Sequence, residues 1–441
     1  MCPVLAVPRE SKTMSKASRE VASQSDSRVA EKRYRILYVQ RPNGGGSATG
    51  LYDMVRVLDR ERFEPVVLFY QQNDFCEAFR ELGAHVMVLS GRTGARPLPA
   101  LVSGAVGGLR DSSNAVRQVN RLIRSDWPLA RRIARLIKRE HIDLVHNNDN
   151  PRGDRASMIA ARLAGVPQVS HVRFLPDYFR PIDRRLATFV DFFIYVSTAV
   201  EQQYRTEIGV PAWKGKVIYD PFDFASFGNG GRSAAQVRTE LGLGDHHQVV
   251  SNVGRIVPWK GQDVFLRAMA QVVRSHPNAV ALIVGSAAAK PAAQEYYCQL
   301  ERLVQELRLS DNVIFTGFRR DIPEIMAASD VVVHSASRPE PFGRVVVEAM
   351  AANRPLVATA AGGVLEIIDD QETGLLVPLE DSARMAQAIE TLLEDAALAE
   401  RMGQRARREA EARYEPQRFA DAIRRIYEGT LAGRAHKSTR G

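Results

Sequence analysis

The chain has 441 residues, and its 60 Lys and Arg against 51 Asp and Glu give a formal net charge of +9. A composition of 45% hydrophobic and 25% charged residues is ordinary for a soluble globular protein, so it excludes wholesale disorder, a collagen-like repeat and a disulfide scaffold. The three cysteines are widely spaced without a CxxC pair, so we expect a protein whose cysteines are reduced, as in the cytoplasm. The sequence also lacks the run of about 18 apolar residues that a bilayer-spanning helix needs.

Residues 1–33 are rich in Ser, Lys, Arg and Glu without a periodic apolar pattern, which predicts a disordered tail. After this tail, short apolar runs alternate with helical patterns. Because the runs lack a clean polar–apolar alternation, they are typical of parallel strands that are buried on both faces. The predicted strands of this first series lie at 35–39, 66–70, 86–89, 142–146, 168–171, 192–196 and 217–219.

A second series of strands and helices follows a Gly-rich segment at 227–233. From Asp381 to Tyr427 the pattern is almost purely helical. We therefore predict an α/β fold with two Rossmann-like, doubly wound domains that face a central cleft, at 34–222 and 223–415, and a C-terminal helix and tail at 416–441 that packs back on the first domain. The predicted strands of the second series lie at 249–253, 279–284, 313–315, 331–334, 356–358 and 374–377.

A glycine run, Gly44-Gly45-Gly46, follows the first predicted strand and precedes a helix. Glycines at this place let the backbone approach a ligand closely, and the free N–H groups of the helix start can bind an anion. The spacing is not GxGxxG, so a simple turn is the alternative. Phosphate contact and a turn both remain open from this motif alone.

Two cations follow the first predicted strand of the second series. Gly254-Arg255 ends the strand, and Lys260 lies at the start of the next helix. At an effective dielectric of about 20, a cation 4 Å from one phosphate charge is worth about 4 kcal/mol before desolvation. Arg binds two phosphate oxygens and Lys acts as a point charge, so the pair suits a diphosphate. The alternative is two solvated surface cations.

The most specific motif runs from Glu340 to Glu348, two carboxylates separated by seven residues after an apolar strand. Pro341 and Gly343 shape a loop at the carboxyl end of that strand, where open α/β sheets bind ligands. Carboxylates accept hydrogen bonds from pairs of sugar hydroxyls, and the helix start offers N–H groups to an anion. The alternatives are an exposed loop acid and a salt bridge between Glu348 and Arg344, worth only about 0.3–0.5 kcal/mol.

Taken together, these motifs resemble those of the retaining GT-B glycosyltransferases of the family 4, group 1 type, which include sucrose synthases and many bacterial polysaccharide and lipid glycosyltransferases. The resemblance is weaker over 34–220, as expected for the half that binds the acceptor. The residues that carry it are Val253-Gly254-Arg255 with Lys260-Gly261, Val284-Gly285, Phe315-Thr316-Gly317-Phe318, the two glutamates, Gly362-Gly363 with Glu366, and Gly374-Leu375-Leu376-Val377.

The resemblance implies a donor-diphosphate site made by both domains. Arg255 and Lys260 would hold the diphosphate beside Gly254. Gly45 and Gly46 would close on it from the first domain. Positive charge at this place would stabilise the leaving diphosphate while the sugar carbon becomes cationic.

It also implies a site for the donor sugar and the ribose. Glu340 would contact donor-sugar hydroxyls, with the backbone of Phe342 and Gly343 beside the sugar. Val345 would complete the donor-binding set, and Glu348 would bind the ribose hydroxyls.

The resemblance implies roles for two further residues, and the sequence departs from the family pattern at one other place. Residues near Phe318 would line the base pocket, and His171 matches a histidine near the donor sugar. A lone His at a strand end is otherwise more often structural. The family commonly has Asn-Gly where this chain has Asp220-Pro221, which puts the geometry of the interdomain hinge in doubt.

The implied activity is transfer of a sugar, with retention at the anomeric carbon, from a nucleotide-diphosphate sugar to a glycan or lipid-linked acceptor, in cell-surface polysaccharide or glycolipid biosynthesis. We expect no metal and no other cofactor, because cations and helix ends carry the charge of the diphosphate. A GT-B-fold nucleotide-sugar epimerase or hydrolase, and a non-catalytic nucleotide-sugar-binding protein, remain as alternatives. Nucleic acid is not an expected partner, because the aromatic residues amount to only 7% and are scattered.

One segment concentrates positive charge. Residues 121–140 contain seven basic and two acidic residues, a net charge of +5, on a predicted amphipathic helix. Such a helix is typical of contact with an anionic membrane surface, which would place a cytoplasmic enzyme on the inner face of the membrane. The alternative is a helix that packs its apolar side on the core and leaves a solvated basic face.

Overall fold

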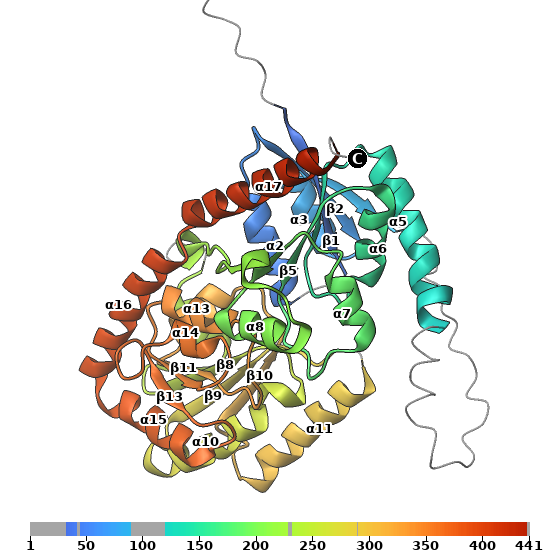
Figure 1. Ribbon diagram of the computed structural model, residues 1–441. Coiled ribbons are helices and arrows are strands. Elements are labelled where there is room, and N and C mark those ends of the chain that lie inside the picture. Colours follow the sequence, from blue (N-terminus) through green and yellow to red (C-terminus); the bar gives the residue numbers. More distant parts are fainter. Residues whose placement is uncertain (1–31, 42–44, 90–119, 228–231, 289, 439–441) are drawn as a thin grey trace, which may run out of the picture.

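The computed structural model describes residues 32–41, 45–89, 120–227, 232–288 and 290–438, which form two parallel sheets with helices packed on both faces (Figure 1). The predicted tail, apart from its last two residues, lies outside this part of the chain. Within the described residues, no helix combines the length and the apolar character needed to cross a membrane.

The first sheet has the strand order β3-β2-β1-β4-β5-β6-β7, and every neighbouring pair is parallel. Its side chains alternate between two cores: Leu37 and Val39 of β1 face one cluster, and Ile36 and Tyr38 face the other. This two-sided burial explains why its strands read as uninterrupted apolar runs. The strands are β1 (Tyr34–Gln40), β2 (Phe63–Phe69), β3 (His85–Val88), β4 (Leu144–Asn147), β5 (Gln168–Val172), β6 (Phe192–Tyr195) and β7 (Gly215–Val217).

Helices cover each face of this sheet. The core on one face contains residues of α5 to α8, and the core on the other contains residues of α2 and α3. A π-helical segment, η1 (Leu122–Asp126), leads directly into α5, and the 3-10 turn η3 (Ala212–Lys214) precedes β7. The helices are α2 (Gly46–Arg56), α3 (Phe75–Glu81), α5 (Trp127–Arg139), α6 (Arg155–Ala164), α7 (Pro181–Ala187) and α8 (Thr198–Gln203).

The second sheet has the order β10-β9-β8-β11-β12-β13 and is also parallel. The turn η5 (Pro258–Lys260) joins β8 to its helix. The strands are β8 (Gln248–Val253), β9 (Ala279–Val284), β10 (Val313–Gly317), β11 (Val331–His334), β12 (Leu356–Thr359) and β13 (Leu375–Val377). The helices are α9 (Ala234–Glu240), α10 (Gln262–Ser275), α11 (Pro291–Glu306), α12 (Ile322–Ala328), α13 (Arg344–Ala351) and α14 (Val364–Ile367).

The chain ends in three consecutive helices, α15 (Ser382–Glu394), α16 (Ala396–Arg413) and α17 (Pro416–Ser438). Figure 1 shows α17 returning from the second sheet to lie beside the first. Its residues Phe419, Ile423 and Tyr427 belong to the same buried cluster as Ile36 and Tyr38. The last helix therefore joins the end of the chain to the core near its beginning.

The predicted α/β fold with two doubly wound parallel sheets is confirmed. The strand predicted at 217–219 begins two residues earlier, at Gly215. Its pairing with β6 ends where the Ile218 N–H donates to the carbonyl of Tyr195 at 2.9 Å, so Tyr219 already belongs to the connection between the sheets.

Candidate active site

A cleft of about 790 Å³ lies between the carboxyl ends of the strands of the two sheets. Both halves of the chain supply its walls, as the position of ligand sites in parallel sheets predicts. Six of the predicted donor-site residues line it: Gly45, Gly46, Arg255, Glu340, Phe342 and Gly343.

Lys260 and Glu340 form an ion pair in this part of the second domain. The Lys260 ammonium lies 2.9 and 3.1 Å from the two carboxylate oxygens of Glu340, and both side chains are largely buried. The His334 ring lies 3.4 Å from the same carboxylate. Burial alone would raise the pKa of Glu340, but the Lys260 charge and the His334 hydrogen bond lower it to about 2. Glu340 is therefore an ionised acceptor for hydroxyl groups at neutral pH.

Arg255 is exposed into the cleft and faces the glycine turn of the first domain. Gly45 adopts a left-handed backbone with φ of 81°, and a Cβ built on it would lie 3.9 Å from the Arg255 Nε. Helix α2 begins at the next residue, so its free N–H groups point toward the same space. A guanidinium and a helix start on opposite walls together make a place for an anion.

The paired glycines hold the Glu340 loop by backbone contact. Gly363 donates its N–H to the Glu340 carbonyl at 2.8 Å. A Cβ on Gly362, which has φ of 64°, would lie 2.2 Å from that carbonyl oxygen, and a Cβ on Gly363 would lie 2.6 Å from the carbonyl of Pro341. Any side chain at these two positions would therefore displace the loop that carries Glu340.

Glu348 lies on α13, one turn in, where its carboxylate is 3.1 Å from the Arg344 Nε. Arg344 also forms an ion pair at 2.8 Å with Asp53 of α2, and these residues are largely buried. The salt bridge between Glu348 and Arg344, which the sequence offers as the alternative to a binding role for Glu348, is therefore present. Its ribose role stays a prediction, since Glu348 is not one of the residues that line the cleft.

The other predicted donor-site residues, Gly254, Lys260, Val345 and Phe318, are not among the residues that line the cleft. Gly254 follows β8 next to Arg255, Val345 is half-buried in the first turn of α13, and Phe318 is 69% exposed after β10. Their roles in donor binding remain predictions.

His171 is fully buried on β5, and burial holds its pKa well below the usual value, so the ring is neutral. Its Nδ1 lies 3.3 Å from the guanidinium of Arg173, and its Nε2 lies 3.7 Å from Asp220. Arg173 and Asp220 form an ion pair, and both line the cleft, whereas His171 does not. Sequence reasoning missed these two residues, although the Asp220-Pro221 departure could have indicated Asp220. The role of His171 near the donor sugar stays a prediction.

A second missed feature is an acidic pair at the carboxyl end of β4. Asp149 lines the cleft, and its backbone N–H donates to the buried carboxylate of Asp154 at 3.1 Å. Burial raises the pKa of Asp149 to about 6 and that of Asp154 well above its usual value. The polar run Asn147-Asn148-Asp149-Asn150, directly after an apolar strand, would have indicated a ligand-facing segment.

Two family descriptions match the chain, one to each half. Residues 44–226 match the description "Glycosyltransferase Family 4", and residues 234–409 match "Glycosyl transferases group 1". The chain belongs to the group 1 glycosyltransferases. Its two sheets with the cleft between them are the GT-B fold of that family.

Solved structures and curated relatives agree with this membership. The Anabaena protein Alr3699/HepE in complex with UDP and glucose is 27% identical, with a TM-score of 0.74 over 90% of this chain and 100% of that chain. Sucrose-phosphate synthase of Thermosynechococcus elongatus, at 20% identity, shares the fold with a TM-score of 0.71 over 91% of this chain and 100% of that chain.

The curated relatives differ in how much of their length is matched. Spore coat protein SA of Bacillus subtilis is 28% identical over 302 residues, which are 66% of this chain and 80% of that protein. Alpha-D-kanosaminyltransferase of Streptomyces kanamyceticus is 35% identical over 195 residues, 44% of this chain and 48% of that enzyme. The chain thus spans about half the length of this second relative.

Proposed function

We propose that the protein is a retaining glycosyltransferase that moves a sugar from a nucleotide-diphosphate sugar to a glycan or lipid-linked acceptor, in the synthesis of cell-surface polysaccharide or glycolipid. One observation carries the proposal. Glu340, which is paired with the largely buried Lys260, and the exposed Arg255 line one cleft together with the Gly45-Gly46 turn at the start of α2.

Each part of this arrangement has a chemical task in glycosyl transfer. Arg255, Lys260 and the N–H groups at the start of α2 would stabilise the negative charge that develops on the leaving diphosphate. Glu340, which is ionised through its contact with Lys260, would accept hydrogen bonds from the sugar hydroxyls. Because this charge is supplied by the protein, we expect activity to survive treatment with a metal chelator.

Relatives support the choice of donor class. The structure of Alr3699/HepE contains UDP and glucose, and a second structure of that protein contains UDP-glucose. UDP-sugars are therefore the first donors to test with this chain. We assign the acceptor side to the first domain, whose residues Asp149, Arg173 and Phe174 line the cleft.

The decisive experiment is a screen of nucleotide sugars for release of the nucleoside diphosphate, with and without glycan or lipid-phosphate acceptors. We expect release that depends on the acceptor, and a product whose anomeric configuration, read by NMR, matches that of the donor. Release without an acceptor would instead identify a hydrolase. A changed sugar without release would identify an epimerase, and binding without either would identify a non-catalytic protein.

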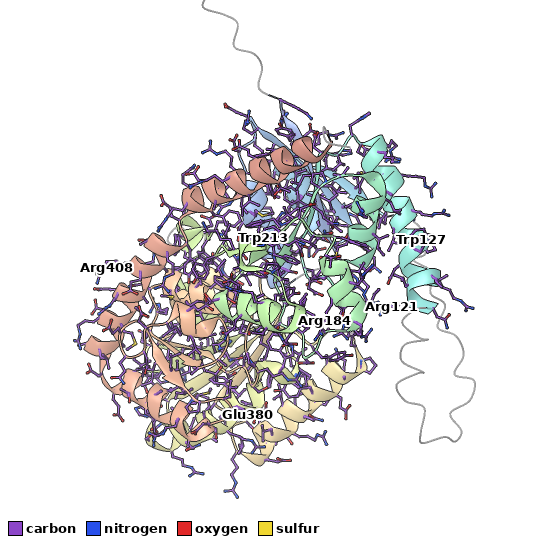
Figure 2. The ribbon with its side chains drawn as sticks, in the orientation of Figure 1. Arg121, Trp127, Arg184, Trp213, Glu380 and Arg408 are labelled. Carbon is purple, nitrogen blue, oxygen red and sulfur yellow. The ribbon has the colours of Figure 1, made fainter. Side chains whose placement is uncertain are left out.

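We also propose that η1 and α5 contact an anionic membrane surface. Ile123 is 59% exposed and Trp127 is 40% exposed, and the Arg131 guanidinium lies 5.5 Å from the Trp127 ring centre. Figure 2 labels Arg121 and Trp127 on this helical segment, which lies at the edge of the molecule. Exposed apolar side chains among arginines suit the boundary between headgroups and acyl chains. The buried residues Ala130, Ile133, Ala134 and Ile137 show that the opposite face of α5 packs on the core.

Co-sedimentation with vesicles tests this contact. We expect binding to vesicles that contain phosphatidylserine and much weaker binding to pure phosphatidylcholine, with loss of the difference in about 1 M salt. Trp127→Ala combined with Arg131→Gln should reduce the binding. Equal binding to both kinds of vesicle would contradict the proposal.

A further inference from the structure

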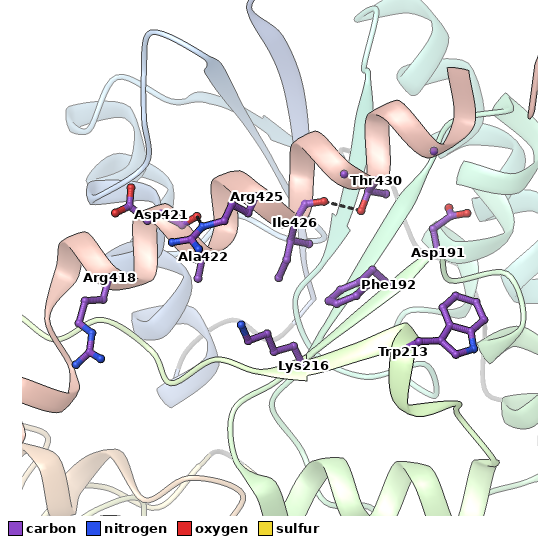
Figure 3. Close-up of a pocket in the computed structure, with 12 residues that line it drawn as sticks. Asp191, Phe192, Trp213, Lys216, Arg418, Asp421, Ala422, Arg425, Ile426 and Thr430 are labelled. Atoms are coloured by element: carbon purple, nitrogen blue, oxygen red, sulfur yellow. Dashed lines mark hydrogen bonds between the residues drawn. The ribbon is translucent and has the colours of Figure 1, made fainter. Parts of the chain in front are cut away.

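A second groove lies on the first domain, away from the transfer cleft. It runs between α17 and the sheet edge formed by β6 and β7, has a volume of about 790 Å³, and shares no lining residue with the cleft (Figure 3). Helix α17 buries Phe419, Ile423 and Tyr427 in the core. A different row of its side chains, from Arg418 to Gly433, is therefore left to form one wall of the groove.

Positive charge collects along this groove. Lys216 of β7 and Arg418 and Arg425 of α17 line it, and all three are exposed. Arg418 donates to the carbonyl of Ala412 and Arg425 to the carbonyl of Asp421, and in the described part of the chain none of the three cations has an ion-pair partner. The carboxylate of Asp421 accepts instead from Arg424 and Gln417. The other carboxylate that lines the groove, Asp191, accepts from the Gln168 N–H. Among its described lining residues, the groove thus has three cations against two carboxylates, and the cations form no ion pair with either carboxylate.

The same groove carries an exposed aromatic platform. Trp213 is 77% exposed, which is unusual for so large an apolar ring and marks a binding surface. In Figure 3, Phe192 lies between Trp213 and Ile426 of the helix, and Lys216 points from the strand toward the helix. On α17, Gly429 and Gly433 present no side chain, and a Cβ at either would meet no atom within 4 Å. The wall next to the aromatic residues is therefore open to a wide ligand.

The length and openness of the groove restrict the ligand. From Arg418 to Gly433 the helix rises about 22 Å. A lipid tail would need an enclosed apolar cavity, and this groove is open to solvent and edged by charges. A strand of a partner protein could pair only with β7, which is three residues long. An extended chain of sugar rings can stack on Trp213 and hydrogen-bond its hydroxyls to Asp191 and Thr430, while acidic groups on it pair with the cations.

We propose that the groove between α17 and β7 binds an anionic oligosaccharide, as an accessory site separate from the transfer cleft. If the proposed function holds, the ligand is a distant part of the glycan that the cleft extends. The binding itself depends on the groove alone, so it can be tested without turnover.

The test measures binding of fluorescently labelled octasaccharides by anisotropy, in the presence of excess UDP. The probes are a heparin-derived octasaccharide, maltooctaose as the neutral counterpart, and octaglutamate as an acidic peptide. We expect the heparin octasaccharide to bind at least about tenfold more tightly than the other two, and more weakly as salt rises. If maltooctaose bound as tightly as the heparin octasaccharide, the ligand would not need to be anionic. If octaglutamate bound as tightly, the ligand would not need to be a glycan. Either result would overturn the proposal.

Variants assign the binding to the groove. Lys216→Gln with Arg425→Gln, and Trp213→Ala alone, should each weaken binding of the heparin octasaccharide by about tenfold. Arg408→Gln on α16, labelled in Figure 2, and Leu163→Ala on α6 are the matched controls, because both residues are exposed and lie outside the groove. Unchanged binding in the groove variants, with thermal unfolding like that of the controls, would overturn the proposal. Donor turnover with a short acceptor should be the same in all of them, so a failure of the proposed function would be seen separately.

Discussion

Lys260 supplies a buried positive charge for both Glu340 and the proposed diphosphate. Its ammonium lies 4.5 Å from the centre of the Trp259 ring and 2.9 Å from the Glu340 carboxylate, and both Trp259 and Glu340 line the cleft. Lys260→Ala leaves the Glu340 carboxylate without this partner and removes a cation from the leaving group. We predict a loss of about 10²–10³-fold in kcat, the range typical of losing one preorganised electrostatic contact.

Steady-state kinetics with the donor found in the screen measure this effect. Lys290→Ala is the control, because Lys290 is an exposed lysine at the start of α11 in the same domain. Unchanged turnover in Lys260→Ala would contradict the role of Lys260 in transfer.

The acidic pair Asp149 and Asp154 makes stability depend on pH. An Asp in the unfolded chain has a pKa of about 3.9, whereas burial raises that of Asp149 to about 6. Between these values the native state retains a proton that the unfolded state has released, so the free energy of unfolding falls as pH rises. Because the two carboxyl groups interact, they contribute to this slope together.

We predict that Asp149→Asn flattens this pH dependence and makes the protein more stable than the wild type at pH 7.5. Urea unfolding at about pH 4.5, 6 and 7.5 measures both effects. Asp245→Asn, which changes an exposed acid, should leave the slope as it is. A variant less stable than the wild type at pH 7.5 would show that the Asp149 charge is favourable.

At the scale of elements, a buried hydrogen-bond chain attaches α17 to the first sheet. The Tyr427 hydroxyl lies 2.8 Å from the Nδ1 of His146 and donates to the Tyr38 hydroxyl at 3.2 Å. Burial lowers the pKa of His146 to about 3, so its ring is neutral and needs this polar partner.

Tyr427→Phe removes the hydroxyl and leaves buried polar atoms unsatisfied. We predict a loss of about 1–3 kcal/mol in the free energy of unfolding with little change in kcat, since Tyr427 does not line the cleft. Urea unfolding and steady-state kinetics measure the two quantities. Tyr52→Phe is the control, because no hydrogen bond of its hydroxyl is described, and an equal loss in both variants would contradict the prediction.

At the scale of the whole molecule, side-chain contacts connect the two domains in addition to the segments of chain that pass between them. Glu366 of α14 accepts the backbone N–H groups of Thr198 and Ala199, at 2.8 and 2.9 Å, and so caps α8 from the other domain. The buried Arg344–Asp53 pair connects α13 to α2. These contacts connect the two domains that form the walls of the cleft.

We predict that Glu366→Gln populates a more open arrangement of the domains. A Gln side chain has one acceptor oxygen for two N–H donors, so half of the cap is lost. The radius of gyration from small-angle X-ray scattering should increase, and the donor KM should rise because fewer molecules hold the closed cleft. Glu295→Gln, at an exposed position of α11, is the control. An unchanged radius and KM would show that Glu366 does not contribute to closure.

Much of the fold could be predicted from the sequence, because its signals are local. Contiguous apolar runs such as those of β1 and β9 predict strands, since both faces of a parallel sheet exclude water. The short edge strand β7 was placed two residues late, because an edge strand has less apolar patterning to mark its ends. The glycine and glutamate motifs of the second domain could be recognised because each directly follows a predicted strand. They therefore belong to the loops at one edge of the same parallel sheet.

The sequence by itself determined the fold class, the family resemblance and the residue types that the second domain contributes to the cleft, because each depends on neighbours in the chain or on regular spacing. Only the tertiary structure decided which side chains meet across long separations. It paired Lys260 with Glu340, placed Arg173 and Asp220 at the cleft while burying His171, and laid α17 beside β7 to form the cationic groove. Such contacts depend on how whole elements pack and on the burial that results, and no local pattern encodes either.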